Sequence, residues 1–340
     1  MKKGLRIGLI LVGIGLGIIL IATLFLGLSG TGFKNKLLNY RMKNPLSWLL
    51  SGTTTNYDYD YDYDYDYDYD YDYDYKIIDK KTYDVDSIDD IELLLKENLC
   101  DVDIKVSNEN HFSISIYKYK NTKEDISVTL NNKVLTLKCP KRNFLNDFKL
   151  FGFLKPKNAE HKIILEVPSK KELTELVIQI GLGHLYVNGI NGKGLRLTVE
   201  GLINITDVNC EVFDFRGGIG GIYFDKIKAE ETHIVSGVGE INSKRCDFNN
   251  LVFRGGIGEF NFDGTLSGDC NLKQGVGNIQ LNLAGDKNMY NFEVTRGVGK
   301  VIIDGKKIKH SEFESSSNTK NNISIDGGLG SLQIDFSGEW

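Results

Sequence analysis

The sequence predicts an all-β protein whose main part is a parallel β-solenoid with rungs of about 19 residues, preceded by an N-terminal transmembrane helix. Three observations support this prediction. A Gly-aliphatic-Gly triplet recurs in the second half of the chain, short runs elsewhere alternate apolar and polar residues, and an uncharged apolar run stands near the amino terminus. The composition agrees, because glycine is abundant at 37 residues and proline is scarce at 4.

The triplet begins at residues 181, 218, 237, 256, 275, 297 and 328, and a worn copy at 199 keeps only its second glycine. Intervals between 218 and 275 are 19 residues, while the later intervals of 22 and 31 predict rungs with loop insertions. Glycine accepts a positive φ and the close approach of another backbone, so we assign these glycines to corners. The predicted corner residues are Gly181, Gly183, Gly201, Gly218, Gly220, Gly237, Gly239, Gly256, Gly258, Gly275, Gly277, Gly297, Gly299, Gly328 and Gly330.

Each triplet is followed by a period-two pattern. The residue between the glycines is aliphatic, and the fourth and sixth positions after the first glycine are mostly apolar. This alternation predicts a strand whose inward side chains stack on those of the next rung. A second short strand precedes each triplet, so we expect two strands per rung. The last segment, SLQIDFSGEW, is expected to cap the far end with Phe336 and Trp340.

The apolar run near the amino terminus covers residues 7–28 and follows Lys2, Lys3 and Arg6. As a helix it spans about 33 Å at roughly 1.5 Å per residue, enough to cross a bilayer core of about 30 Å. We expect an uncleaved anchor, because a cleaved signal peptide, the alternative, has a shorter apolar run and a small-x-small cleavage site. Basic residues also follow the run, so flanking charge leaves the orientation open.

Composition divides the chain into five parts. They are a transmembrane anchor at 1–30, a basic, amphipathic juxtamembrane linker at 31–56, a Tyr-Asp spacer at 57–75, an irregular β region capping the solenoid at 76–170, and the repeat solenoid at 171–340. In the capping region, NN at 131 predicts a hairpin, and IDDIELLLKEN fits a short helix or a first strand equally. Such irregularity is expected of the end of a repeat array.

The spacer alternates ten tyrosines with nine aspartates. Repulsion between its carboxylates favours an extended chain of roughly 60 Å, at about 3.3 Å per residue, so we interpret it as a stand-off from the bilayer. Adhesion of its tyrosines to a wall polymer or partner is the alternative. Without these aspartates, the net charge of -5 becomes +4, too weak and dispersed to predict binding to nucleic acid.

No cofactor or metal site is predicted. No triplet has the third glycine of a dinucleotide-binding GxGxxG motif, and GGIGGI and GGIGEF lack the aspartate of calcium-binding repeats. The odd number of cysteines without a CxxC spacing indicates buried small hydrophobes rather than disulfides or zinc ligands. They are Cys100, Cys139, Cys210, Cys246 and Cys270.

The region from about residue 85 to 338 resembles the bacterial DUF4097 adhesin domains. The resemblance rests on DVDIKVSNENHFSISIYKY with NNKVLTLKC, on HKIILEVPSKKELTELVIQIGLGHLYV, and on the GVGxIxL rungs ending in GKKI and GGLGSLQIDF. It implies a solenoid-like, all-β domain of a kind commonly carried by membrane-anchored proteins, some related domains accompanying envelope-stress regulators. It implies no enzymatic activity and no catalytic residues.

Two sets of charged residues are candidate sites. Asp225, Asp263 and Asp304 follow the triplet strands and resemble the acids of a solenoid glycanase, but aspartate is also a common turn residue. A ladder of Arg216, Arg254 and Arg296 before the corners suits an anionic ligand, or solvated edge charge. The five histidines form no catalytic motif.

The sequence therefore predicts a non-enzymatic, membrane-anchored solenoid that presents a binding or scaffolding surface outside the cell. A protein or a cell-wall polymer is the expected partner. The alternatives are a cytoplasmic-facing or envelope-stress signalling component and, more weakly, a carbohydrate-active enzyme.

Overall fold

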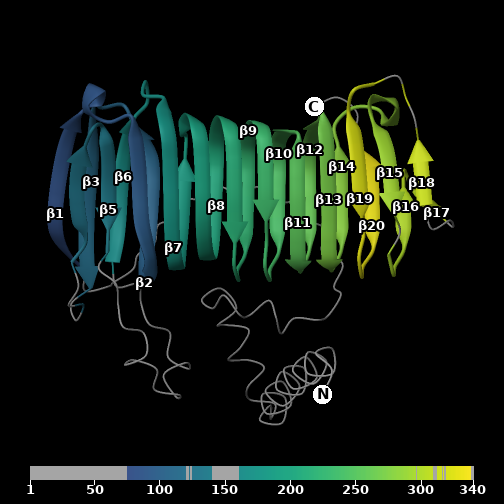
Figure 1. Ribbon diagram of the computed structural model, residues 1–340, viewed down its shortest axis with the longest axis horizontal. Helices are drawn as coiled ribbons and strands as arrows, with labels where there is room; N and C mark the ends of the chain where they lie inside the picture. Colours follow the sequence, from purple (N-terminus) through teal and green to yellow (C-terminus); the bar gives the residue numbers. More distant parts are fainter. Residues whose placement is uncertain are drawn as a thin grey trace, which may run out of the picture. The chain divides into compact units, whose positions relative to one another are not determined.

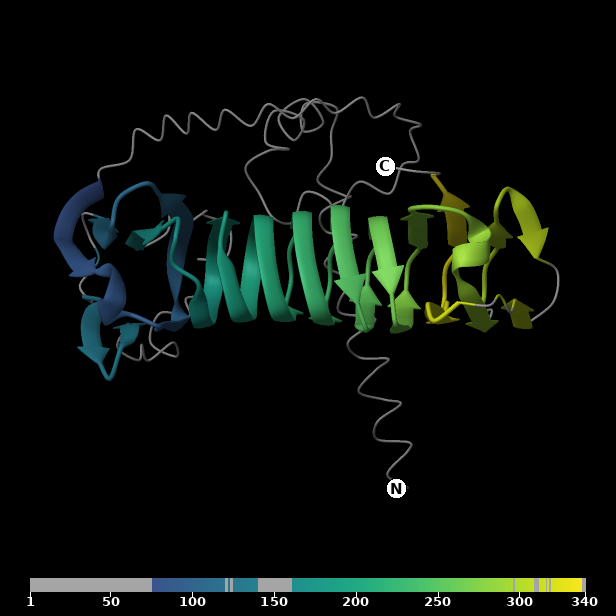
Figure 2. The same cartoon turned by 90° about the horizontal axis from the view of Figure 1, so that it is seen from above.

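The computed structural model describes residues 75–119, 122, 125–139, 161–295, 297–308, 312–315, 317 and 319–337. These residues form β-strands and two short 3-10 helices, Val85–Ser87 and Lys287–Met289, and the described part holds no α-helix. The strands stack along one long axis as a solenoid (Figures 1 and 2). The all-β prediction is confirmed for this part of the chain.

No helix within these ranges is long and apolar enough to cross a membrane. The predicted anchor at 1–30, the linker at 31–56 and the spacer up to residue 74 lie outside the described residues. Tyr75, the last residue of the predicted spacer, opens the first strand.

The middle of the solenoid consists of two long strands followed by six shorter ones. The long strands are β7 (Leu173–Asn188) and β8 (Asn191–Gly217), and they are followed by β9 (Ile222–Val235), β10 (Ile241–Asn249), β11 (Leu251–Ile257), β12 (Phe260–Ser267), β13 (Asp269–Val276) and β14 (Ile279–Leu283). Each rung pairs in parallel with the rung one repeat away. Ile241, for example, pairs with Ile222 on one side and with Phe260 on the other.

Each regular rung has three sides, not the two strands expected from the sequence. The third side arises because β10 bends at Arg245, which has a φ of 51° and lies where the register to β12 shifts. Three pairs of buried side chains consequently point inward, one pair on each side: Ile241 and Ser243, Cys246 and Phe248, and Leu251 and Phe253.

Stacked rings fill the centre of these rungs. Phe253 and Phe260 lie face to face with their centroids 4.0 Å apart, and Phe213 meets Phe224 edge to face at 5.3 Å. All four side chains are at most 1% exposed. Edge-to-face pairs such as Phe213 and Phe224 stabilise a core beyond the burial of their area, so the rungs are held together by packing as well as by backbone hydrogen bonds.

The amino-terminal end combines one rung with hairpins. The strands are β1 (Tyr75–Asp84), β2 (Asp90–Ser107), β3 (His111–Tyr119), β4 (Ser127–Asn131), β5 (Val134–Lys138) and β6 (His161–Pro168). β2 pairs in parallel with β7 on one side and with β5 and β6 on the other, whereas β1, β3 and β4 pair antiparallel. From Asp90 onward the segment IDDIELLLKEN is therefore part of a strand, and the rungs begin inside the range 76–170.

The carboxy-terminal end departs from the chain order. The strands are β15 (Asn291–Thr295), β16 (Val301–Ile303), β17 (Lys306–Ile308), β18 (Glu312–Ser315), β19 (Asn322–Asp326) and β20 (Leu332–Phe336). β19 pairs in parallel with both β13 and β15, and β20 with both β14 and β16. The last rung of the sequence thus lies between the two rungs that precede it, as Figure 1 shows.

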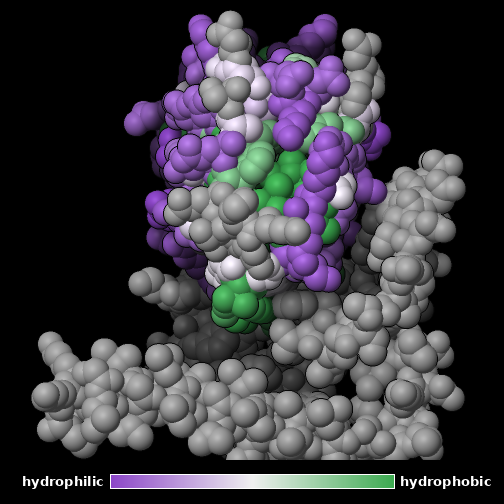
Figure 3. Space-filling model, turned by 90° about the vertical axis from the view of Figure 1, so that its right-hand side faces the viewer, coloured by the Kyte–Doolittle hydropathy of each residue, from purple (hydrophilic) through white to green (hydrophobic). Residues whose placement is uncertain are grey.

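The expected cap is consequently wrong for Phe336. This residue belongs to the inserted rung, where its ring lies 6.0 Å from Phe292 and 6.1 Å from Tyr290, while Trp340 lies outside the described residues. The outermost rung is instead that of β15 and β16, whose outer edges pair antiparallel with β18 and β17. Figure 3 views this end, where apolar surface shows between polar side chains and an apolar patch stands at the lower edge.

Candidate functional site

The Gly-aliphatic-Gly triplets form one corner of the solenoid, where strands such as β11 and β13 end side by side (Figure 1). Gly258 illustrates why glycine is needed there. Its φ is 143°, and a Cβ on it would overlap the carbonyl oxygen of Gly239 in the neighbouring rung. Its amide also donates to the carbonyl of Val276 at 2.9 Å, so the rungs meet here backbone to backbone.

The other predicted corner glycines occupy equivalent places. Second glycines at 201, 220, 239, 277 and 299 all have φ between 124° and 158°. A Cβ on Gly183, Gly256 or Gly330 would overlap a carbonyl of an adjacent rung. This corner has no room for side chains on either side of the aliphatic residue. The aliphatic side chain is therefore flanked along the chain by glycine backbone.

The aliphatic residues of the corner point outward, although their apolar character suggested part of the core. Six of them follow one another on consecutive rungs, and we call them the aliphatic stripe: Ile219, Val238, Ile257, Val276, Leu329 and Val298. Ile219 is 49% exposed, Ile257 53% and Val298 73%. Leu182, in an earlier rung, is also exposed at 47%, and in the rung between, Glu200 takes the equivalent position.

Two rows of residues flank the stripe. The leading row lies two positions before the first glycine of each triplet and the trailing row three positions after it. In spatial order, the leading row is Arg216, Val235, Arg254, Lys273, Asp326 and Thr295. The trailing row, ordered by the backbone hydrogen bonds between rungs, is Gly221, Glu240, Glu259, Asn278, Ser331 and Lys300.

These rows correct the proposed arginine ladder. Arg216 and Arg254 lie in one row with Val235 between them, but the next cation is Lys273. Thr295 takes the equivalent place in the rung of Gly297, and Arg296 lies outside the described residues. Lys273 lies one regular interval of 19 residues after Arg254 and was missed because only arginines were considered, whereas the place of Asp326 beside it depends on the inserted rung.

The three candidate acids do not form a site. Asp225 is mostly buried and accepts two hydrogen bonds from the guanidinium of Arg245, which takes up its charge. Asp263 accepts from Asn282, and burial raises its pKa. Asp304, with a φ of 52°, forms the turn between β16 and β17 with Gly305.

The cysteines are buried and form no disulfide with one another. Burial raises the pKa of Cys210 and Cys246 to about 12 and that of Cys270 to about 11, so these thiols stay protonated near neutral pH. A protonated, enclosed thiol is a poor nucleophile. Within the described ranges, no group of three or more His, Cys, Asp or Glu residues is arranged to hold a metal ion.

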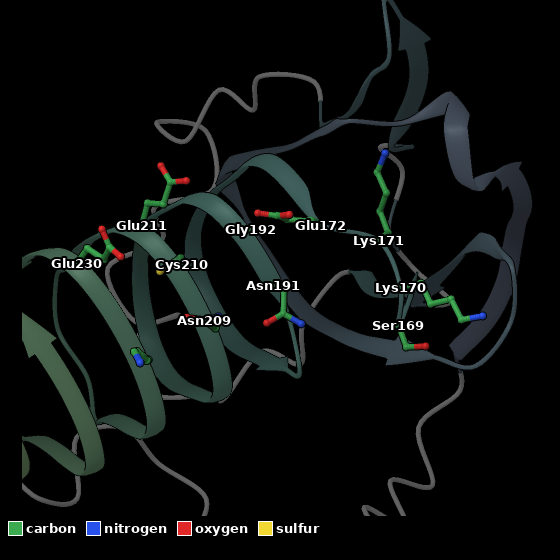
Figure 4. Close-up of a pocket in the computed structure, with 11 residues that line it drawn as sticks. Ser169, Lys170, Lys171, Glu172, Asn191, Gly192, Asn209, Cys210, Glu211 and Glu230 are labelled. Carbon is green, nitrogen blue, oxygen red and sulfur yellow. The ribbon is translucent and has the colours of Figure 1, made fainter.

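A polar groove lies away from the stripe, at the junction of β6 and β7 with β8 and β9. Its volume is about 420 Å³, and it is lined by Ser169–Glu172, Asn191, Gly192, Asn209–Glu211, Lys228 and Glu230. Figure 4 shows Lys170 and Lys171 at one end and Glu211 and Glu230 at the other, spread apart rather than converging. The groove therefore lacks the convergent polar groups that fix a small ligand.

One buried polar residue under the corner also escaped the sequence analysis. Gln274 is 6% exposed, and its Nε2 donates to the carbonyl oxygens of Gly258 and Val276 at 3.0 and 3.1 Å. These bonds hold two consecutive corners from inside. The only signal in the sequence was a glutamine directly before a triplet, where several other copies have glycine or serine.

Comparison with known proteins gives one family. A model of the family Toastrack DUF4097 matches residues 88–334. No match was found among curated proteins.

Three solved structures are similar at low identity. A "putative cell adhesion protein" from Clostridium sporogenes is 15% identical, with a TM-score of 0.27, over 77% of this chain and 100% of its own. A "putative adhesin" from Bacteroides fragilis is 15% identical, with a TM-score of 0.40, over 76% and 97%. Another from Parabacteroides merdae is 12% identical, with a TM-score of 0.26, over 75% and 95%. At these TM-scores the three structures carry no argument about the function of this chain.

Proposed function

Since the chain belongs to the Toastrack DUF4097 family, we propose that it is a membrane-anchored, non-enzymatic β-solenoid that presents a binding surface outside the cell. The surface is the aliphatic stripe. The observation that supports it is the exposure of its aliphatic side chains: five of the six are between 42% (Val276) and 73% (Val298) exposed, and Val238 is partly exposed. A contiguous row of exposed apolar residues is characteristic of an interaction site.

The absence of assembled chemistry within the described residues favours a binding role over catalysis. Asp225 is neutralised by Arg245, Asp304 forms a turn, and Asp263 lies beside an amide rather than a second acid. A glycoside hydrolase needs two carboxyl groups facing each other across the scissile bond. The corner amides of Gly239, Gly258 and Gly277 already donate hydrogen bonds to neighbouring rungs, so they are not available to bind a polar substrate.

Cysteine labelling of intact cells tests the location. Lys228, exposed on the side away from the stripe, is replaced by cysteine in the full-length chain. An impermeant maleimide should then label the variant in intact cells and leave the native chain unlabelled, because its own cysteines are buried. Labelling that appears only after lysis, while an external marker protein reacts before lysis, contradicts the extracellular proposal and favours the cytoplasmic alternative.

An adhesion assay tests the surface. Cells carrying the full-length chain with Ile219→Asn, Ile257→Asn and Val276→Asn are compared with cells carrying the native chain. The matched control makes the same number of changes in the groove: Glu211→Asn, Lys228→Asn and Glu230→Asn, all at exposed positions. We expect loss of attachment between cells or to wall polymer for the stripe variant alone. Equal attachment by the stripe variant and the native chain, at equal surface amounts, overturns the assignment.

A further inference from the structure

The stripe is flanked by charges of opposite sign. Over its first four rungs the leading row carries Arg216, Arg254 and Lys273, and the trailing row carries Glu240 and Glu259. The three cations and Glu259 are exposed, and Glu240 is partly exposed. The surface therefore has an apolar centre, a basic side and an acidic side.

The signs reverse together at the end of the stripe. Asp326 occupies the leading row on the inserted rung, and Lys300 occupies the trailing row on the outermost rung, one rung further along. Both side chains are exposed. Each change of sign in one row is thus matched, within one rung, by the opposite sign in the other row.

Side-chain amides hold the acidic row in position. Glu240 Oε1 accepts from Nδ2 of Asn242 at 2.9 Å and of Asn261 at 3.1 Å, and Glu259 Oε1 accepts from Nδ2 of Asn278 at 3.1 Å. These bonds fix the carboxylates in place and reduce the side-chain entropy that a new ion pair would have to overcome. The acidic row is preorganised for cations on another surface.

Two copies that meet stripe to stripe can be related by a twofold axis in one of two directions. An axis parallel to the stripe turns the leading row of one copy toward the trailing row of the other, at the same rung. Arg254 then faces Glu259 of the second copy, and Asp326 comes within one rung of Lys300. An axis perpendicular to the stripe reverses the direction of the second copy and turns the leading rows toward each other. When this axis crosses the stripe at its midpoint, Arg254 meets Lys273, which is repulsive.

We propose that the aliphatic stripe binds the stripe of a second copy of this chain, with the two solenoids side by side and pointing in the same direction. The pairing is isologous, and each rung meets its own equivalent. It deepens the proposed function, on which it rests, by identifying the partner. The parallel direction also suits two chains anchored in one membrane, because both solenoids then leave the bilayer with the same polarity.

A contact along one edge of the solenoid is narrow, and this agrees with an anchored protein. Confinement to one membrane raises the effective concentration of a partner, so that a weak contact is sufficient for pairing. The stripe provides an apolar centre and the rows provide direction, since complementary charge mainly determines which arrangement is allowed.

Crosslinking of full-length chains in isolated membranes tests the direction. Ile219→Cys and Leu329→Cys chains, expressed separately, should each give a covalent dimer with a short bismaleimide, because each residue meets its own copy in the parallel arrangement. In the perpendicular arrangement Ile219 meets Val298, so a dimer would form only when Ile219→Cys and Val298→Cys chains are mixed. In the parallel arrangement these two residues lie about 24 Å apart, five rungs of about 4.8 Å. Lys228→Cys is the control that should give no dimer.

Charge reversal tests the rows. Arg254→Glu or Glu259→Arg alone should raise the dissociation constant of the dimer about fivefold, as expected for the loss of two weak exposed ion pairs. The chain carrying both changes should recover the native value, since the two charges are then exchanged and opposite signs again face each other across the interface. A double variant as weak as the single variants overturns the parallel arrangement.

The outcomes separate this proposal from the proposed function. If the stripe variant loses attachment but neither Ile219→Cys nor Leu329→Cys forms a dimer, the stripe is a binding surface for another partner, and self-pairing is wrong. If both form dimers but the stripe variant still attaches, self-pairing stands and the role of the stripe in attachment is wrong. A dimer only from mixed chains overturns the parallel direction.

Discussion

Asn322 lies directly beside Asp269, with its Nδ2 atom 2.7 Å from Oδ1 of the aspartate, although the two residues are 53 positions apart in the sequence. On its other side, Asn322 Oδ1 accepts a hydrogen bond of 2.8 Å from Asn291. The three residues form a polar ladder across the inserted rung. The rung that comes last in the sequence is thus hydrogen-bonded on both sides to rungs formed by earlier parts of the chain.

The ladder should contribute to stability. Asn322→Ala removes both side-chain hydrogen bonds, so we expect the free energy of unfolding to fall by about 1 kcal/mol, since the bonds are exposed. Chemical denaturation of the full-length protein in detergent, followed by circular dichroism, measures this change. Asn271→Ala, an identical substitution at an exposed position of β13, should leave the midpoint unchanged. Equal effects of the two substitutions would show that the ladder has no specific role.

The corner glycines should be sensitive to crowding as well as to backbone angle. Gly258→Ala places a Cβ against the carbonyl of Gly239, and we expect a loss of about 3 kcal/mol or more, because stacked backbones cannot move apart locally. Gly305→Ala is the matched control, since its φ is 68° but no atom lies within 4 Å of the added Cβ. It should cost only about 1 kcal/mol. Similar losses at both positions, measured by thermal unfolding, would mean that crowding is unimportant.

The stripe and the core should respond differently to the same polar substitution. Ile257→Asn changes a side chain that is 53% exposed, so the free energy of unfolding should change by about 0.5 kcal/mol or less. Phe253→Asn, in the same strand, changes a side chain that is 1% exposed and should cost about 4 kcal/mol. Urea denaturation of both variants measures the two losses. A large loss for Ile257→Asn would show that this side chain belongs to the core and not to the binding surface.

Asp263 should make stability depend on pH. Burial raises the pKa of this carboxyl above that of the unfolded chain, so the folded state holds the proton at a pH where the unfolded state has released it. Stability associated with Asp263 is therefore present below the unfolded pKa of about 3.8 and is lost as the pH rises through the folded pKa. Relative to the native chain, Asp263→Asn should become more stable as the pH rises from 3 to 7.

Urea denaturation at a series of pH values measures this effect. Thr265→Ser, on the same strand as Asp263, changes no ionisable group and is the control that should show a flat difference. A flat difference for Asp263→Asn as well would show that its carboxyl is equally solvated in both states. Its buried Oδ1, which has no hydrogen-bond partner, is the structural reason to expect otherwise.

Regular repeats made the central rungs predictable. The 19-residue interval fixes which residues stack, and the fourth and sixth positions of each copy, such as Phe260 and Phe262, are indeed buried. The bend at Arg245 and at its equivalents in neighbouring rungs was not predictable, because Asp207, Lys226 and Arg245 adopt positive φ there although they are not glycine. Their conformation is imposed by the stacking of rungs, and no residue preference in the sequence indicates it.

Only part of the candidate surface could be predicted from the sequence. The aliphatic residue between the glycines was evident, but an apolar residue in a repeat predicts burial as readily as exposure. Alternation alone does not decide the matter, because Ile257 has the parity of buried Phe253 in its own strand but the opposite parity to buried Phe260 beyond the corner. The structure shows that it points outward, since its side chain is 53% exposed. The sequence predicted a basic ladder that included Arg216 and Arg254, but neither the acidic row nor the change of sign at its end, since Lys273 and Asp326 become neighbours only through pairing of β13 with β19.

The sequence by itself determined the all-β class, the length of the rung and the position of the glycine corner, because period and residue type are local properties. Only the tertiary structure decided the order of the last three rungs, the third side of each rung and the outward direction of the stripe. The physical reason is that β13 and β14 present the same pattern of backbone donors, acceptors and apolar side chains to any rung that follows. Asn322 and the ring of Phe336 select β19 and β20 for that place through contacts with residues more than 40 positions away.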